Sequence, residues 1–350
     1  MSLSIVLLAA GEGKRMKTNL PKPLVMLGSD PLVQHSLNTI KIMKPEKTIL
    51  VTGFKKDEVK KYVLSNNSGD FIFCEQKERL GTGHAVQQAA PYIPVNGKTI
   101  VLYSDVPLVS AKTLKKLIRS SLRKKISILT TNLKNPKGYG RVVRTEKQDI
   151  EAIREEADAN SKEKQIQEIF SGIMVVDNAF LKKGLKTLVR NNAAGEYYLT
   201  DLVSYAQRTK NKVGSYSIEQ EEVLGANNKN ELSELYKAMV ALNIRAAKQK
   251  GTIFKDEDTC YVEGQLKVGK DVKIGNNVTL KGNVQLGDSV VIESNCLISN
   301  SKILKGSIIK DFCSIEDSKI ASNVEVGPFA RLRSGAMLES SSKVGNFVEI

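Results

Sequence analysis

The stretch LSIVLLAAGEGKRMKTNLPKPL, residues 3–24, decides the fold of the first part of the chain and predicts its chemistry. Residues 3–8 are almost all apolar, which is typical of a strand that is covered on both faces of a parallel sheet. Arg15 and Lys22 follow at the end of this strand, and such cations suit an anion with several phosphate oxygens. The small residues between strand and cations would let a ligand approach the backbone closely: Ala9, Ala10, Gly11 and Gly13.

Two common phosphate-binding loops do not fit this stretch. The P-loop pattern requires Gly where Leu8 stands and Ser or Thr where Arg15 stands. The dinucleotide-binding fingerprint requires a third Gly, and Met16 occupies that position. What remains, LAAGEGKRM followed by PKPL, resembles the signature of the sugar-nucleotide pyrophosphorylases. Lys14 is a departure, because that family usually has Thr there.

The composition is that of an ordinary globular protein. The 350 residues suffice for two or three domains, and 41% of them are hydrophobic and 26% charged. No apolar run reaches the ~18 residues that a membrane-spanning helix needs, and the N-terminus lacks a signal-peptide pattern. The cysteines show no C-x-x-C spacing, so we expect buried thiols in a reducing cytoplasm rather than disulfides or a zinc site: Cys74, Cys260, Cys296 and Cys313.

The net charge of +15 comes from 53 basic and 38 acidic residues that are spread along the chain. Local pairs are expected on helix faces: Lys55-Lys56, Lys60-Lys61 and Lys124-Lys125. No basic segment is interleaved with aromatic residues, so we expect no specific nucleic-acid binding. We expect a basic, solvated surface that also attracts anionic substrates.

Short apolar runs alternate with helical patterns over residues 1–225, which predicts a doubly wound α/β nucleotide-binding domain with a mostly parallel sheet. Amphipathic helices are expected at 33–43 and 111–122. Ligands bind at the carboxyl ends of the strands in such sheets. The expected strands are Ile5–Leu8, Ile49–Val51, Phe71–Phe73, Ile100–Tyr103, Ile126–Leu129 and Ile173–Val176.

After residue 225 the spacing of the apolar residues changes twice. Residues 226–250 carry one apolar stripe at spacings of three and four, which predicts a connecting helix. Residues 251–350 carry apolar residues every six positions, separated by Gly, Asn, Asp and Ser. That period predicts a parallel β-helix with three short strands per coil. The six-residue spacing becomes irregular around residues 302–322. No polar cap follows by Ile350, so we expect the β-helix to be incomplete.

This layout resembles one family, the bacterial bifunctional N-acetylglucosamine-1-phosphate uridylyltransferase / glucosamine-1-phosphate acetyltransferases, over essentially the whole chain. The resemblance implies a left-handed β-helix of hexapeptide repeats. The motifs that carry it are LAAGEGKRM (8–16), LGTGHAVQQAAP (80–91), LYSDVPL (102–108), GYGR (138–141), QIQEI (165–169), GEYYLTD (195–201), GANN (225–228) and GPFARLR (327–333).

The resemblance implies transfer of UMP from UTP to N-acetylglucosamine-1-phosphate, giving UDP-N-acetylglucosamine and pyrophosphate for cell-wall and lipopolysaccharide precursors. Arg15 and Lys22 would hold the phosphates, and charge neutralisation is what this reaction needs most. Asp105 and Asn227 would hold Mg²⁺, for which hard oxygen ligands are suited. The nucleotide would lie along residues 8–13 and Tyr103, Ser104 and Asp105.

Base and sugar recognition are implied by the same comparison. Gln76, Gly81 and Thr82 would read the uracil edge. Gly140 and Glu155 would bind the sugar, whereas Phe170 stands where the family usually has Asn, in IFSGI instead of INTGI. A lost hydrogen bond of this kind costs on the order of 1–3 kcal/mol, so sugar affinity should be weaker.

The second reaction of the family, acetyl transfer from acetyl-CoA, takes place on the β-helix. Arg333 matches a residue that contacts the sugar nucleotide there. The general-base His and most acetyl-CoA contacts fall after the last residue given, so residues 1–350 should lack this activity. The resemblance further implies a cytoplasmic homotrimer without membrane insertion.

Two alternatives remain open. The chain could be another sugar-1-phosphate nucleotidyltransferase with a β-helix, acting on glucose-1-phosphate or mannose-1-phosphate. It could also be a non-catalytic regulatory subunit of the same fold, although Arg15, Lys22 and Asp105 are all present.

Overall fold

The computed structural model describes residues 2–350, and the chain divides into two compact units. The first contains Met1–Val25 and Pro31–Leu232, and the second contains Met26–Asp30 and Ser233–Ile350. The sequence places residues 26–30 in the first domain, whereas here they belong with the second unit. There the Ser29 hydroxyl donates to the Glu263 carbonyl (2.5 Å) and accepts from the Gly282 amide (3.0 Å).

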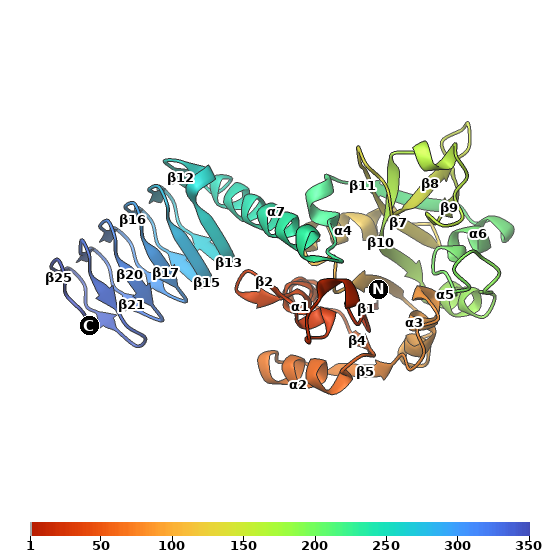
Figure 1. The fold of residues 1–350 in the computed structure, drawn as a ribbon, viewed down its shortest axis with the longest axis horizontal. Coiled ribbons are helices and arrows are strands. Elements are labelled where there is room, and N and C mark those ends of the chain that lie inside the picture. Colours follow the sequence, from red (N-terminus) through yellow and green to blue (C-terminus); the bar gives the residue numbers. More distant parts are fainter. Residues whose placement is uncertain (1) are drawn as a thin grey trace. The chain divides into compact units, whose positions relative to one another are not determined.

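The first unit is built on a nine-stranded sheet with the order β11-β7-β10-β6-β1-β4-β5, to whose β10 the β8–β9 hairpin is attached (Figure 1). Only β10 and the hairpin run antiparallel to their neighbours, so the sheet is mostly parallel. The strands are β1 (Leu3–Ala9), β4 (Lys47–Thr52), β5 (Phe71–Glu75), β6 (Lys98–Tyr103), β7 (Ile126–Asn132), β8 (Gly140–Arg144), β9 (Ile150–Arg154), β10 (Glu168–Asp177) and β11 (Val213–Ser217).

Helices cover both faces of this sheet, and each face has its own core. On β1, Val6 and Leu8 pack into the core under α3, α5 and α6, whereas Ile5 and Leu7 pack into the core under α1, α2 and α4. The expected double burial of the first strand is therefore confirmed. The helices are α1 (Leu32–Met43), α2 (Lys56–Asn66), α3 (Thr82–Ala89), α4 (Ala111–Ser120), α5 (Asn178–Leu185) and α6 (Asp201–Arg208).

The second unit begins in α7 (Lys229–Lys248), which the apolar stripe predicts, and continues as a stack of parallel coils. One sheet contains β12 (Ile253–Phe254), β14 (Lys273–Ile274), β16 (Val291–Ile292), β19 (Ile308–Ile309), β22 (Glu325–Val326) and β25 (Lys343–Val344). The other contains β13 (Tyr261–Val268), β15 (Thr279–Leu286), β17 (Leu297–Ser299), β18 (Lys302–Ile303), β20 (Ser314–Glu316), β21 (Lys319–Ile320), β23 (Arg331–Leu332) and β24 (Met337–Leu338). The short hairpin β2 (Met26–Leu27) and β3 (Asp30–Pro31) forms a sheet of its own.

The pairing of successive coils explains why the six-residue spacing is irregular around residues 302–322. Leu280 pairs with Ile298, and Ile298 pairs with Ile315, so successive coils differ by 18 and then 17 residues. The shorter coils have one residue fewer at the corners around Ser301 and Ser318. The buried Ser301 hydroxyl donates to the Ser299 carbonyl (2.6 Å), and the buried Ser318 hydroxyl donates to the Glu316 carbonyl (2.7 Å). Because the deletion is confined to a corner, the strands keep their inward apolar side chains.

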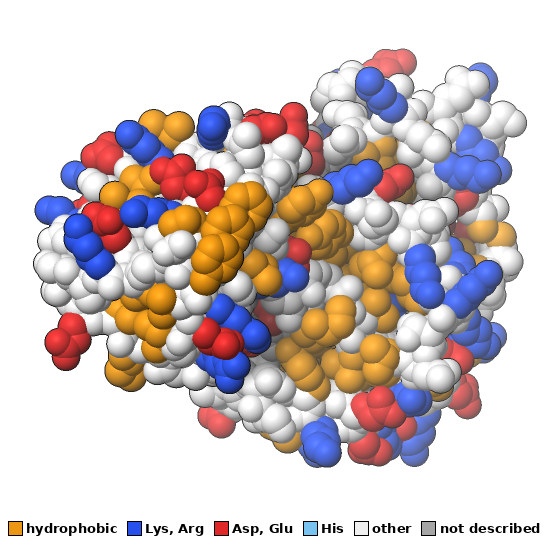
Figure 2. All heavy atoms as spheres, turned by 60° about the vertical axis from the view of Figure 1, so that its left-hand side comes forward, with side chains coloured by type: hydrophobic (Ala, Val, Ile, Leu, Met, Phe, Trp, Pro, Cys, Tyr) orange, Lys and Arg blue, Asp and Glu red, His pale blue; other side chains and the backbone are white. Residues whose placement is uncertain are grey.

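The surface is mixed in charge. Figure 2 shows basic and acidic side chains interspersed over one face of the molecule, with apolar side chains gathered in places. Lys56, Lys60 and Lys61 lie on α2 as expected, but Lys124 and Lys125 do not lie on a helix, because α4 ends at Ser120. No helix in residues 2–350 is long and apolar enough to cross a membrane.

Candidate active site

The loop after β1 is built around the side chain of Lys22. Gly13 has a φ of 72°, and a Cβ there would lie 3.0 Å from the Lys22 Cβ. A Cβ on Gly11 would lie 3.5 Å from the Lys22 Cδ. The lysine stem is buried beneath this loop, so Gly13 supplies both the left-handed conformation and the space that Lys22 needs.

The Lys22 ammonium contacts two oxygens from distant parts of the chain. It forms a short ion pair with Asp105 Oδ2 and donates to Asn227 Oδ1 over 2.9 Å. Asp105 follows the carboxyl end of β6, next to the carboxyl end of β1, because the Ser104 amide donates to the Leu8 carbonyl (3.0 Å). Three groups that the sequence predicts for phosphate and metal binding therefore meet at one point.

The segment that carries Asn227 is fixed from both sides. The Ala226 amide donates to the Asp105 carbonyl (3.2 Å), and a Cβ on Gly225 would lie 3.1 Å from that oxygen. Glu231 Oε2 accepts from the Asn227 backbone amide (2.8 Å) and from its side-chain Nδ2 (3.1 Å). This leaves Oδ1 of Asn227 directed at Lys22.

Sequence reasoning missed Glu231, although a signal was present. Asn228 and Glu231 have half of a capping box at the start of α7: the Glu231 amide donates to Asn228 Oδ1 (2.9 Å), but the Glu231 carboxylate accepts from the amide of Asn227, one residue before the box position. The N-x-x-E spacing in NNKNE is the pattern of such a box. A helix-capping residue thus also orients a candidate site residue.

Arg15 and Lys14 lie on the exposed outer part of the loop. Arg15 belongs to the short 3-10 helix Lys14–Met16 and is exposed. Lys14 is 3.7 Å from Glu12, whose carboxylate also forms a short ion pair with Arg79. Arg79 lowers the pKa of Glu12. The Glu12–Arg79 pair joins the β1 loop to the segment that leads into α3.

That segment carries the expected base-recognition residues. Gln76 is buried and donates through Nε2 to the Gly81 carbonyl (3.0 Å). Gly81 has a φ of 100°, and a Cβ there would lie 2.7 Å from the Tyr197 carbonyl, so only Gly fits. The Thr82 hydroxyl accepts from the Leu199 amide (3.2 Å). The structure therefore brings Gln76, Gly81 and Thr82 together.

The expected sugar-binding residues also meet. Gly140 pairs with Phe170 across β8 and β10, and a Cβ on Gly140 would lie 3.4 Å from Glu155 Oε2. Thr200, in the GEYYLTD motif, donates its hydroxyl to Glu155 Oε1 (2.9 Å). Burial raises the pKa of Glu155, and the hydrogen bond from Thr200 partly offsets that effect. Phe170 is 6% exposed and packs into the core.

Tyr103 lies among the three groups of residues. Burial raises its pKa, the carboxylates of Glu155 and Asp105 add to that rise, and the Thr82 hydroxyl opposes it. A Cβ on Gly172 would lie 3.0 Å from the Tyr103 ring. The phosphate, base and sugar residues of the prediction thus form one neighbourhood at the carboxyl ends of the strands.

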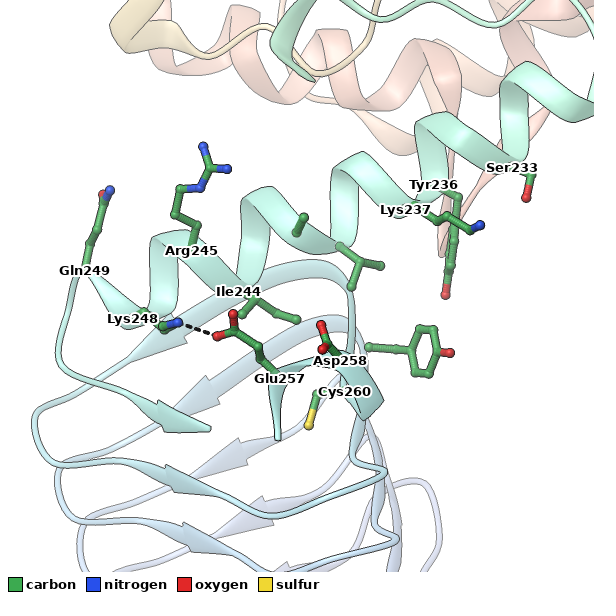
Figure 3. Close-up of a pocket in the computed structure, with 13 residues that line it drawn as sticks. Ser233, Tyr236, Lys237, Ile244, Arg245, Lys248, Gln249, Glu257, Asp258 and Cys260 are labelled. Carbon is green, nitrogen blue, oxygen red and sulfur yellow. Dashed lines mark hydrogen bonds and ion pairs between the residues drawn. The ribbon is translucent and has the colours of Figure 1, made fainter. Parts of the chain in front are cut away.

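Arg333 lies in the second unit. It is exposed and donates through Nε to Glu349 Oε1 (2.7 Å), which lowers the pKa of Glu349. A groove of about 910 Å³ in the same unit, between α7 and the first coil, contains none of the predicted residues (Figure 3). Its rim carries the Lys248–Glu257 ion pair.

Comparison with known proteins identifies the family. Residues 5–169 match the MobA-like NTP transferase domain, and residues 259–350 match the GMPPB C-terminal domain. The bifunctional protein GlmU of Idiomarina loihiensis is 41% identical in an alignment of 351 positions that covers 100% of this chain and 76% of that one. The chain belongs to the GlmU family.

Other GlmU proteins match over the same share of both chains, 100% and 76%. The identity is 41% over 352 residues for Nitrosomonas eutropha and 40% over 351 for Acinetobacter baumannii. A solved structure described as a glucose-1-phosphate thymidylyltransferase from Bacillus anthracis shares the fold, with a TM-score of 0.56 at 15% identity over 67% of this chain and 94% of that one. GlmU membership makes the chain a nucleotidyltransferase that forms UDP-N-acetylglucosamine.

Proposed function

We propose that the first unit carries out uridylyl transfer at the point where Lys22 meets Asp105 and Asn227. A phosphate oxygen of N-acetylglucosamine-1-phosphate attacks the α-phosphorus of UTP, the bond from that phosphorus to the β-phosphate oxygen breaks, and pyrophosphate leaves. The convergence of these three side chains on one point is the observation that supports this proposal best.

The side chains at this point would act by charge and position. The nucleophile is already anionic, so the reaction needs no general base. Lys22 and Arg15 would neutralise the phosphates as charge develops on the leaving pyrophosphate, which is the main contribution that a site of this kind makes. The buried stem of Lys22 keeps its ammonium close to the site, whereas Arg15 is exposed on the outer part of the loop.

Asp105 and Asn227 would hold Mg²⁺. The fit is supported by the Lys22 ammonium, a cation that already contacts one oxygen of each residue. Residues 2–350 contain no cluster of three or more His, Cys, Asp and Glu side chains suited to a metal. One carboxylate and one amide oxygen suit Mg²⁺, which usually keeps several waters and binds substrate phosphates. When bound, it would withdraw charge from the phosphate oxygens.

The neighbouring groups would supply specificity. Gln76, with the backbone of Gly81 and Thr82, would read the uracil edge, since an amide offers both a donor and an acceptor. Gly140 and Glu155 would contact the sugar, with Phe170 as an apolar wall. Arg333 would contact the sugar nucleotide of a second, acetyl-CoA-dependent site on the β-helix. A cytoplasmic homotrimer is part of the same proposal.

Pyrophosphate release tests the proposal directly. The chain is assayed with each of the common nucleoside triphosphates against N-acetylglucosamine-1-phosphate, glucose-1-phosphate and mannose-1-phosphate, with and without Mg²⁺. We expect release only with UTP, best with N-acetylglucosamine-1-phosphate, and only with Mg²⁺. Preference for another triphosphate or sugar would support the alternative nucleotidyltransferase. Light scattering tests the trimer separately.

A further inference from the structure

The edge of the first unit's sheet that faces away from the candidate active site has a composition of its own. Strands β1, β4, β5, β6, β7 and β11 are parallel, so their amino ends share one edge, and the antiparallel β10 ends there at Asp177. The candidate site lies at the opposite, carboxyl-end edge. Six strand spacings of about 4.8 Å make this amino-end edge roughly 30 Å long.

Cations dominate the chain segments that enter the strands at this edge. The acidic residues there are Glu46, Asp70 and Asp177. The Ser2 hydroxyl donates to Glu46 (2.5 Å), and Lys125 forms an ion pair with Asp177 (3.3 Å). The cations are Lys41, Lys44, Lys47, Lys98, Arg119, Arg123, Lys124, Lys125, Lys210 and Lys212.

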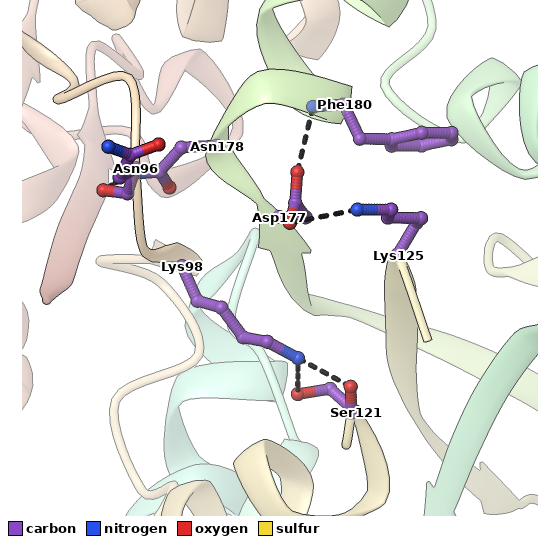
Figure 4. Close-up of polar contacts among 7 residues, drawn as sticks. All are labelled: Asn96, Lys98, Ser121, Lys125, Asp177, Asn178 and Phe180. Atoms are coloured by element: carbon purple, nitrogen blue, oxygen red, sulfur yellow. Dashed lines mark hydrogen bonds and ion pairs between the residues drawn. The ribbon is translucent and has the colours of Figure 1, made fainter. Parts of the chain in front are cut away.

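Several of these cations lie close together in sequence at the end of α4 and in the turn that follows it. Lys98 is buried beneath it and donates through Nζ to the carbonyl and the hydroxyl of Ser121, the latter at 2.5 Å (Figure 4). A cation therefore already caps the carboxyl end of α4 from inside. Among residues 2–350, none forms an ion pair with Arg119, Arg123 or Lys124.

Aliphatic side chains project from the same edge. Ile42 at the end of α1 is 61% exposed, Val95 before β6 is 66% exposed, and Leu122 after α4 is 62% exposed. They come from three separate segments, each of which leads into a strand at this edge. Ile42 and Leu122 are each next in sequence to an exposed cation of the edge, Lys41 and Arg123.

We propose that this amino-end edge binds the surface of a membrane that contains anionic lipids. Basic residues attract such a surface at about 1 kcal/mol each, and exposed aliphatic side chains can insert at the boundary of headgroups and acyl chains. Nucleic acid fits less well, because binding to single strands relies on aromatic residues that stack on bases, and the residues exposed here are aliphatic. The active-site edge would face away from the lipid.

Vesicle flotation of the full chain tests this surface. One set of vesicles contains phosphatidylethanolamine with phosphatidylglycerol, and the other contains phosphatidylcholine alone. We expect binding to the anionic set only, weakening as salt is added. The double variant Arg119→Gln/Arg123→Gln should bind about 30-fold more weakly, from about 1 kcal/mol for each cation.

Matched variants separate this surface from a general effect of charge. Lys267→Gln/Lys281→Gln removes the same charge from exposed positions of the β-helix and should leave vesicle binding unchanged. Leu122→Ser should weaken vesicle binding roughly tenfold. Pyrophosphate release should be unaffected in all of these variants, which shows that they are folded.

Three outcomes would overturn the proposal. One is no flotation with anionic vesicles at low salt. The second is equal loss in the β-helix control, which would indicate net charge alone. The third is that Leu122→Ser has no effect while a DNA duplex binds through Arg119 and Arg123, which would assign the edge to nucleic acid.

Discussion

Lys22 donates a hydrogen bond of 2.9 Å to Asn227, a residue 205 positions away in the sequence. The contact joins the loop after the first strand to the residues that precede α7. Because Lys22 also pairs with Asp105, one ammonium holds three chain segments together at the carboxyl edge of the sheet.

Replacing Lys22 tests the charge at this point. Lys22→Gln removes the cation that would neutralise the phosphates, so we expect kcat for pyrophosphate release to fall on the order of 10²–10³-fold. Lys17→Gln, an exposed change in the same loop, should remain within twofold or so of the unchanged chain. A folded Lys22 variant that keeps most of its rate would show that the charge is not needed.

Glu231 should act on the metal through Asn227. Glu231→Ala frees the Asn227 side chain to rotate, so we expect the Mg²⁺ concentration for half-maximal rate to rise severalfold, with much of kcat recovered at high Mg²⁺. Loss of the hydrogen bonds that the Glu231 carboxylate accepts at the start of α7 should also cost ~1 kcal/mol of stability. Glu234→Ala, on the exposed side of the same helix, is the control. An equal Mg²⁺ response in both variants would leave Glu231 a structural role only.

Phe170→Asn should improve sugar binding while it weakens the core. An amide at this position would offer hydrogen bonds to the sugar, so we expect a lower KM for N-acetylglucosamine-1-phosphate. Phe170 is 6% exposed, and removing its ring from the core should lower the free energy of unfolding by about 3 kcal/mol. Steady-state kinetics and thermal melts measure the two effects. An unchanged or higher KM would contradict the first.

Glu155 should make stability depend on pH. Burial raises its pKa above the ordinary value of about 4.3, so the unfolded chain ionises first as pH rises. Folding therefore loses stability from about pH 4 upward, until the pH passes the raised pKa of the folded state. Glu155→Gln should raise Tm at pH 7 but leave it unchanged below pH 4, and it should raise KM for the sugar phosphate. An equal gain at both pH values would assign the effect to packing.

The Glu156 carboxylate is the counter-charge of the buried Arg141 guanidinium. The Arg141 side chain is 2% exposed and pairs with Glu156 at 2.7 Å. Glu156 also accepts from the Gly138 amide (3.0 Å), and both contacts lower its pKa. Glu156→Gln leaves the guanidinium without its counter-charge, so we expect a loss of about 3 kcal/mol in a denaturant titration. Glu146→Gln, in an exposed turn, should be nearly neutral.

The sequence was a good guide wherever a signal is local. The continuous apolar run of β1, which is buried on both faces, and the six-residue spacing after residue 251 each come from side chains that lie near one another in the chain. The strands of the hairpin β8–β9 were not predicted, because the place of β8 in the sheet is set by its pairing with β10, which is distant in the sequence.

The site could be predicted only in part, for the same reason. The glycines and cations of the first loop are visible in residues 8–22, and the resemblance supplied their distant partners Asp105 and Asn227. The pair Glu12–Arg79 and the hydrogen bonds from Asn227 to Glu231 depend on how segments meet in space. Residues 26–30 belong to the second unit through tertiary contacts such as the hydrogen bond from Ser29 to Glu263, and no local sequence pattern predicts such contacts.

The shortened corners at Ser301 and Ser318 indicate where a β-helix of this kind can lose or gain a residue during evolution. A codon lost within a strand would turn every later side chain of that strand to the other face, whereas a codon lost at a corner leaves the pairing of Ile298 with Ile315 intact. Corners are thus the positions where we expect the β-helix to tolerate insertions and deletions. A short peptide tag placed at such a corner should be accommodated without disturbing the coils above and below it.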